Sequence, residues 1–159
     1  MKFNKVKNMS GSRGFTLIEL MVTIAVIAIL AMIAAPSMAN LIAKQRLNST
    51  TRELAETFTA ARSQASLLRR EVTVNLNATT TNTATNFYWN PATGNTLTAP
   101  LLSDIPSIVF LPNGTLKDTA TNTRFTDTSF VICNSKAGKT KTITLTRIGI
   151  ATMGAEGIC

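Results

Sequence analysis

The chain has 159 residues, which is enough for one modest folded domain but too few for two domains with separate cores. It contains no histidine and only two cysteines, which excludes Ser-His-Asp and Cys-His catalytic groups and a tetrahedral zinc site formed within one chain. The formal net charge is +8, but four of the 16 basic residues lie before residue 15, so the rest carries 12 basic and 8 acidic side chains. We therefore expect a mildly basic protein that is not an enzyme and has no catalytic residue, metal or cofactor.

The first predicted element is an apolar helix. The 21 residues from 15 to 35 carry Glu19 as their only charge, and at about 1.5 Å per residue a helix of this length crosses a bilayer. A charge inside such a segment is costly unless it is paired, which makes Glu19 a candidate functional residue. The residues before the helix contain no acid and place the N-terminus in the cytoplasm, because positive residues remain on that side. These basic residues are Lys2, Lys5, Lys7 and Arg13.

The small residue Gly14 lies before the apolar run. An ordinary secretory signal peptide has its small-residue cleavage site after that run instead. Cleavage after Gly14 would therefore keep the apolar helix and expose Phe15 as a new N-terminus. Either Met1 or Met9 can be the start of translation, and the second would leave a leader of only six residues.

Gly14, Phe15 and Glu19 together resemble the start of type IV pilin-like proteins with a class III leader. The resemblance implies that a prepilin peptidase cleaves after Gly14 and N-methylates Phe15. It also implies that, on assembly, the Glu19 carboxylate pairs with the N-terminal amine of a neighbouring pilin. The protein would be a single-pass protein of the bacterial inner membrane, with a cytoplasmic N-terminus and a periplasmic C-terminal domain, before it enters a pilus or pseudopilus. The alternative is a plain membrane anchor with an unpaired Glu19.

A second, amphipathic helical segment is predicted over residues 37–70. Pro36 is expected to kink the helix, since it removes one backbone hydrogen bond, and the helix then resumes. Apolar and small residues recur at spacings of three and four on one stripe, which favours packing against a folded domain. The stripe comprises Leu47, Thr51, Leu54, Phe58, Ala61, Ala65, Leu68 and Val72. Alternatively, the stripe could pack against a partner helix in a coiled coil, but its small residues would make a weak coiled-coil interface.

Beyond residue 70 the apolar residues no longer recur at helical spacing, and the sequence patterns typical of strands begin. Alternating or aromatic-rich runs predict strands over 72–76, 86–89, 107–111, 129–134 and 140–147. A turn is predicted at 112–114, and the polar stretch 78–85 is expected to be an exposed loop. The predicted fold is therefore α+β, with a long N-terminal helix packed on a C-terminal antiparallel β-sheet domain. The corresponding segments are a leader (1–14), a membrane or filament-core helix (15–36), an amphipathic helix (37–70) and a β-rich domain (71–159).

The two cysteines, Cys133 and Cys159, are expected to form a disulfide in an oxidising periplasm. Closing this loop would stabilise the fold by roughly 3–4 kcal/mol in the chain-entropy model and would tie the C-terminus to a strand. The alternative is two unpaired thiols.

Further segments of the second half resemble the GspH/FimT family within the pilin-like group. These are residues 54–55, 60–65, 70–74, 109–115 and 130–133. The resemblance implies a minor pilin or pseudopilin in the tip or initiating complex of a filament. Two machines use this domain: type IV pili, where the FimT branch assists DNA uptake in natural transformation, and the type II secretion system, where it is a pseudopilin.

Basic residues in the C-terminal part predict DNA binding. Lys136, Lys139, Lys141 and Arg147 flank or line the last predicted strand, where they can meet successive phosphates without contacting bases. DNA-binding FimT proteins carry a Gly-Arg-x-Arg-like segment near the C-terminus, and Arg147 is the one arginine at that place here. The alternatives are a solvated strand edge, and a pseudopilin for protein export that does not bind DNA.

Overall fold

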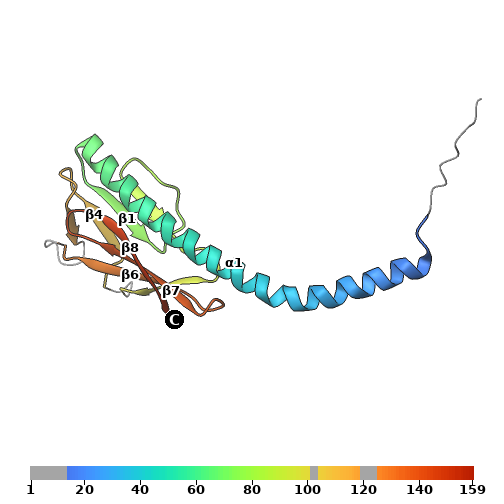
Figure 1. Ribbon diagram of the computed structural model, residues 1–159. Helices are drawn as coiled ribbons and strands as arrows, with labels where there is room; N and C mark the ends of the chain where they lie inside the picture. Colours follow the sequence, from blue (N-terminus) through green and yellow to red (C-terminus); the bar gives the residue numbers. More distant parts are fainter. Residues whose placement is uncertain (1–13, 101–103, 119–124) are drawn as a thin grey trace, which may run out of the picture. The chain divides into compact units, whose positions relative to one another are not determined.

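The computed structural model describes residues 14–100, 104–118 and 125–159 (Figure 1). The leader residues Lys2, Lys5, Lys7 and Arg13 and both candidate start residues, Met1 and Met9, lie outside this description. The chain divides into two compact units, which meet between Met38 and Ala39 and are described separately.

The first unit contains the N-terminal part of helix α1 (Leu17–Leu68). α1 holds a segment that is long and apolar enough to cross a membrane. Its large apolar side chains are exposed, from Leu17 (76%) to Ile33 (71%), as is Phe15 just before it (84%). The helix continues through Pro36 without a break, in agreement with the predicted long helix.

The second unit confirms the predicted helix packed on an antiparallel β-sheet domain, and this domain contains two four-stranded sheets. Sheet A has the order β2-β1-β4-β5 and includes one parallel pair, β1 with β2. Its strands are β1 (Val72–Leu76), β2 (Asn86–Trp89), β4 (Ser107–Phe110) and β5 (Leu116–Asp118). Sheet B has the order β3-β6-β7-β8, and all its pairs are antiparallel. Its strands are β3 (Asn95–Ala99), β6 (Thr128–Asn134), β7 (Lys139–Leu145) and β8 (Ala151–Ile158).

The three strands that we did not predict are β3, β5 and β8. β3 is mostly polar, and β5 has only three residues. β8 contains two glycines and one acid and is exposed over most of its length, so it lacks the alternation of buried residues that marks a strand. These strands form because a neighbouring strand supplies hydrogen-bond partners, which a local pattern does not reveal.

The core forms where α1 packs on both sheets. Leu47, Leu54 and Phe58 of the predicted stripe are buried, whereas Leu68 is 38% exposed, so that the stripe ends one turn earlier than predicted. The Phe58 ring lies 6.3 Å from that of Phe110 on β4 and 5.3 Å from that of Phe130 on β6. One helical side chain therefore joins the two sheets, and burying such a ring contributes about 1.5–3 kcal/mol.

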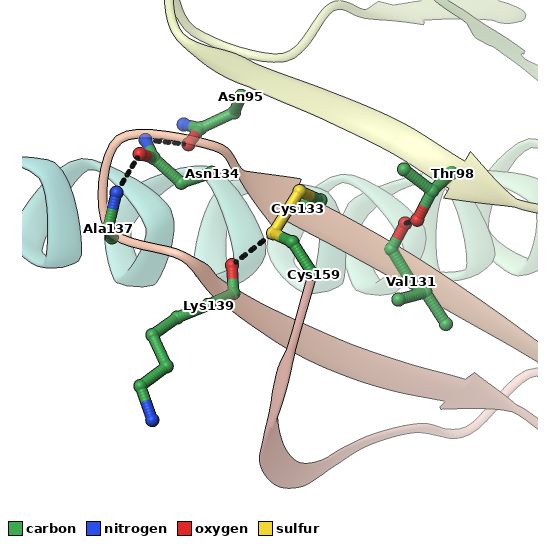
Figure 2. Close-up of a disulfide and its surroundings, with 8 residues drawn as sticks. All are labelled: Asn95, Thr98, Val131, Cys133, Asn134, Ala137, Lys139 and Cys159. Atoms are coloured by element: carbon green, nitrogen blue, oxygen red, sulfur yellow. Dashed lines mark hydrogen bonds between the residues drawn. A yellow bond between two sulfur atoms is a disulfide. The ribbon is translucent and has the colours of Figure 1, made fainter.

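Buried amides fix sheet B against α1. Asn95 Nδ2 donates to Thr50 Oγ1 (2.7 Å) and to the Arg46 carbonyl (3.2 Å). Asn134 Nδ2 donates in turn to Asn95 Oδ1 at 2.7 Å, and the Ala137 N–H donates to Asn134 Oδ1 at 2.9 Å, as Figure 2 shows. Because buried polar groups require partners, this chain of bonds sets the position of the β6–β7 turn beside α1.

Candidate filament and nucleic-acid interface

The start of α1 is a capping box formed by Thr16 and Glu19. The Glu19 N–H donates to Thr16 Oγ1 at 3.3 Å, and the Thr16 N–H donates to Glu19 Oε2 at 3.4 Å. This reciprocal pair satisfies two donors that a helix N-terminus leaves open, and the helix dipole favours a carboxylate at this end. Glu19 is exposed, and its carboxylate contacts Thr16, the second residue after the bond that we predict to be cleaved. Thr16 was missed in the sequence analysis, although the Thr-x-x-Glu pattern is its signal.

Cys133 and Cys159 are joined by a disulfide, with their Cα atoms 5.6 Å apart. The bond connects β6 to the end of the chain beyond β8, with β7 between the two strands (Figure 2). The Cys159 N–H also donates to the Gly138 carbonyl at 3.4 Å, and Cys159 Sγ contacts the Lys139 carbonyl oxygen. The C-terminus is thereby held beside the β6–β7 turn, which contains Lys136 and is followed by Lys139, the first residue of β7.

The four predicted DNA-binding residues occupy two separate regions. Lys136 lies in the β6–β7 turn, and Lys139 and Lys141 lie at the beginning of β7. Arg147 follows the opposite end of β7, which its seven residues place about 20 Å away at 3.4 Å per step. The lysines therefore gather at one end of sheet B, and Arg147 stands apart from them.

Two of these basic residues have acidic neighbours. Lys139 Nζ lies 3.5 Å from Glu156 Oε1 on β8, which offsets part of its charge. The Arg147 N–H donates to Asp127 Oδ1 at 2.8 Å, and the Arg147 side chain shares a hollow with that carboxylate. Within the described ranges, Lys136 and Lys141 make no ion pair with a carboxylate.

α1 adds basic residues that we did not predict as site residues. Arg46 and Lys136 line one hollow, and Arg52 and Lys141 line another. The two arginines are six positions apart, and at about 100° per residue this places them on the two flanks of the helix. The sequence does indicate that both arginines lie outside the apolar stripe, at positions next to the packed face of the helix.

A third helix arginine, Arg62, connects two turns. Its Nε donates to the Gly114 carbonyl at 3.4 Å, and its side chain lies against Gly149. A Cβ added to Gly149 would lie 2.5 Å from the Gly114 carbonyl oxygen, so only glycine fits there. The Thr146 N–H donates to the Ile150 carbonyl at 2.9 Å, which closes the turn that carries Arg147. Two segments on which the GspH/FimT resemblance rests, 60–65 and 109–115, thus meet the turn that carries Arg147.

Comparisons with known proteins agree with this architecture. The model of the prokaryotic N-terminal methylation motif matches residues 9–35, and the model of the type II transport protein GspH matches residues 50–149. Two crystal structures of the type IV minor pilin FimU from Pseudomonas aeruginosa PAO1 are similar in fold. One has a TM-score of 0.50 and 20% identity and covers 69% of this chain and 93% of FimU. The other has a TM-score of 0.49 and 17% identity and covers 70% and 90% respectively.

A search among curated proteins found no match. The GspH model nevertheless covers residues 50–149, which is more than half of the chain, and the methylation motif precedes it. The chain therefore belongs to the GspH family of pilin-like subunits.

Proposed function

We propose that this protein is a minor type IV pilin that enters the tip or initiating complex of a pilus and binds DNA there without sequence preference. The assembly part rests on the methylation motif and on the exposed apolar half of α1. The FimU crystal structure with a TM-score of 0.50, which is described as a type IV minor pilin, supports the same assignment. The DNA would then be held for uptake in natural transformation.

Assembly begins in the inner membrane. The N-terminus lies in the cytoplasm and the folded domain in the periplasm, because the positive charges precede α1. A prepilin peptidase cleaves after Gly14 and methylates Phe15. The apolar segment then leaves the lipid for the filament core, where other pilins cover it and Glu19 pairs with the Phe15 amine of a neighbouring subunit.

The observation that carries the DNA-binding proposal is the distribution of charge at one end of sheet B. Basic side chains gather on α1 and on the β6–β7 hairpin beside it. One of them, Lys139, forms an ion pair with Glu156. These residues are Arg46, Arg52, Lys136, Lys139 and Lys141. Such a surface attracts phosphates and releases their counterions, and it carries no groups arranged to distinguish bases.

A binding measurement with the full-length protein in nonionic detergent tests this proposal. Fluorescence anisotropy with two labelled duplexes of unrelated sequence should give equal affinities that fall steeply as salt rises. Replacing Lys136, Lys139 and Lys141 together by Ala should lower the affinity about tenfold or more and reduce the salt dependence. Lys117→Ala, which removes a charge from β5 in sheet A, is the control and should bind like the wild type. Equal binding by the triple variant would contradict the proposed surface.

The second candidate is a pseudopilin of a type II secretion system, which the description of the matching family model favours. Such a subunit would contact other pseudopilins and exported cargo and would not require a basic surface. A wild-type protein that binds neither duplex even at low salt would favour this candidate.

A further inference from the structure

A groove with basic and neutral polar walls lies between one flank of α1 and the edge of sheet B. It has a volume of about 470 Å³ and is lined by residues of three elements. α1 contributes Gln45, Asn48, Ser49 and Arg52, β7 contributes Lys141, and β8 contributes Met153. We call it the helix–strand groove.

The two cations of this groove have no partner within the described part of the chain. Arg52 is exposed and Lys141 is partly buried, and neither makes an ion pair or a side-chain hydrogen bond there. Lys141 is on the same face of β7 as Ile143 and Leu145, which are both buried, and this alternation directs it towards α1. The groove therefore has one unpaired positive charge on each wall.

Carboxylates near the groove do not cancel these charges. Glu156 is the register partner of Lys141 in β8, but its carboxylate pairs with Lys139 instead. Glu56 lies one turn beyond Arg52 on α1, outside ion-pair distance, in the less favourable Arg-before-Glu order. The lining residues of the groove themselves carry two positive charges and no negative one.

The lining chemistry suits a phosphodiester backbone better than a peptide. Guanidinium, ammonium, amide and hydroxyl groups are the side chains that contact phosphate oxygens in protein–DNA interfaces. A peptide strand added to an edge requires pockets for alternate side chains, and Met153 is the one large apolar residue among the lining residues. A single exposed Met side chain can instead contact a sugar or the face of a base.

We infer that the helix–strand groove binds the phosphodiester backbone of one nucleic-acid strand, with Arg52 and Lys141 contacting its phosphates from opposite walls. This inference rests on the proposed DNA binding and specifies the residues that carry it. Arg52 thereby becomes a binding residue on α1, and Glu156 becomes an acidic neighbour that weakens binding.

Single substitutions in the full-length protein in nonionic detergent test the groove. Arg52→Ala and Lys141→Ala should each weaken binding of a labelled duplex and lower the slope of log affinity against log salt by about one. Arg52→Lys should retain the slope. Arg70→Ala removes an equal charge from an exposed position beyond the end of α1 and should leave both quantities unchanged. Glu156→Gln should tighten binding, since it removes a negative charge beside Lys141.

The same variants are measured with the corresponding single strand and with vesicles that contain phosphatidylglycerol. Equal loss for duplex and single strand supports a contact with one backbone. If the wild type binds duplex but Arg52→Ala and Lys141→Ala behave like Arg70→Ala, the groove is refuted while DNA binding elsewhere stands. If the wild type binds neither nucleic acid, the proposed DNA binding itself fails. Binding to vesicles alone that Arg52→Ala abolishes would overturn the inference in favour of a lipid surface.

Discussion

At the scale of single residues, the structure shows contacts of side chains whose role cannot be predicted from the residue type alone. Thr16 and Glu19 cap α1, and Arg62 holds two glycine turns together. Glu19 is conspicuous in the sequence because it is a lone charge in an apolar run. Thr16 and Arg62 could not be predicted in the same way, because the role of a threonine or an arginine depends on the partner that the fold brings near.

The contact between Arg62, Gly114 and Gly149 leads to a stability prediction. Gly149 has φ +76°, and an added Cβ would meet the Gly114 carbonyl at 2.5 Å and Arg62 Cδ at 2.9 Å. Gly149→Ala should therefore lower the free energy of unfolding by about 2–4 kcal/mol, from backbone strain together with the clash. Urea denaturation followed by the fluorescence of the buried Trp89 measures this change.

Gly138→Ala is the matched control for this prediction. Gly138 also has a positive φ, +61°, but a Cβ there meets nothing within 4 Å. It should cost only the backbone strain, about 1–2 kcal/mol. Equal losses in the two variants would show that the close approach of the turns does not matter.

At the scale of secondary-structure elements, the strongly patterned segments were predictable and the weakly patterned ones were not. The helical stripe predicted the packed face of α1, and alternation predicted β1 and β7. β8 was missed because it is an edge strand whose side chains are mostly exposed, and its pairing with β7 uses backbone groups. The parallel pairing of β1 with β2 was also missed, because it depends on the path of the intervening loop.

The disulfide makes a prediction about β8. Replacing Cys133 and Cys159 together by Ala should lower the free energy of unfolding by about 3–4 kcal/mol if the chain-entropy model holds. Because β8 is an edge strand, its last residues should become almost unprotected from hydrogen exchange, whereas β1 and β4 should lose only the protection that the lower global free energy of unfolding removes. Hydrogen exchange read by mass spectrometry compares the variant with the oxidised wild type. Unchanged protection of residues 156–159 would contradict a role of the disulfide in holding this strand.

At the scale of the whole molecule, the sequence predicted the family and the fold class better than the site. Gly14, Phe15 and Glu19 lie within one short motif, so that no folding was needed to recognise them. A surface site is assembled from distant segments, and a scan along the chain cannot place Arg52 opposite Lys141. The four predicted basic residues lie close together in sequence, yet β7 carries Arg147 away from the lysines.

The capping box complicates the role of Glu19 in assembly, because a substitution could act through the helix end instead of through the charge. Gln at this position can still accept the Thr16 N–H bond, whereas it cannot form an ion pair with an amine. Thr16→Ala has the opposite effect, since it weakens the cap and keeps the charge. These two variants separate capping from pairing.

We propose that the Glu19 carboxylate pairs with a neighbour's N-terminal amine when the subunit enters the filament. The most direct measurement is the amount of Glu19→Gln protein in sheared filaments, relative to the amount in the inner membrane, by quantitative immunoblot. We expect normal membrane levels for Glu19→Gln and Glu19→Ala with at least a tenfold loss from the filaments, because an unpaired amine in an apolar core costs several kcal/mol. Thr16→Ala should assemble nearly as well as the wild type. Normal assembly of Glu19→Gln would contradict the account.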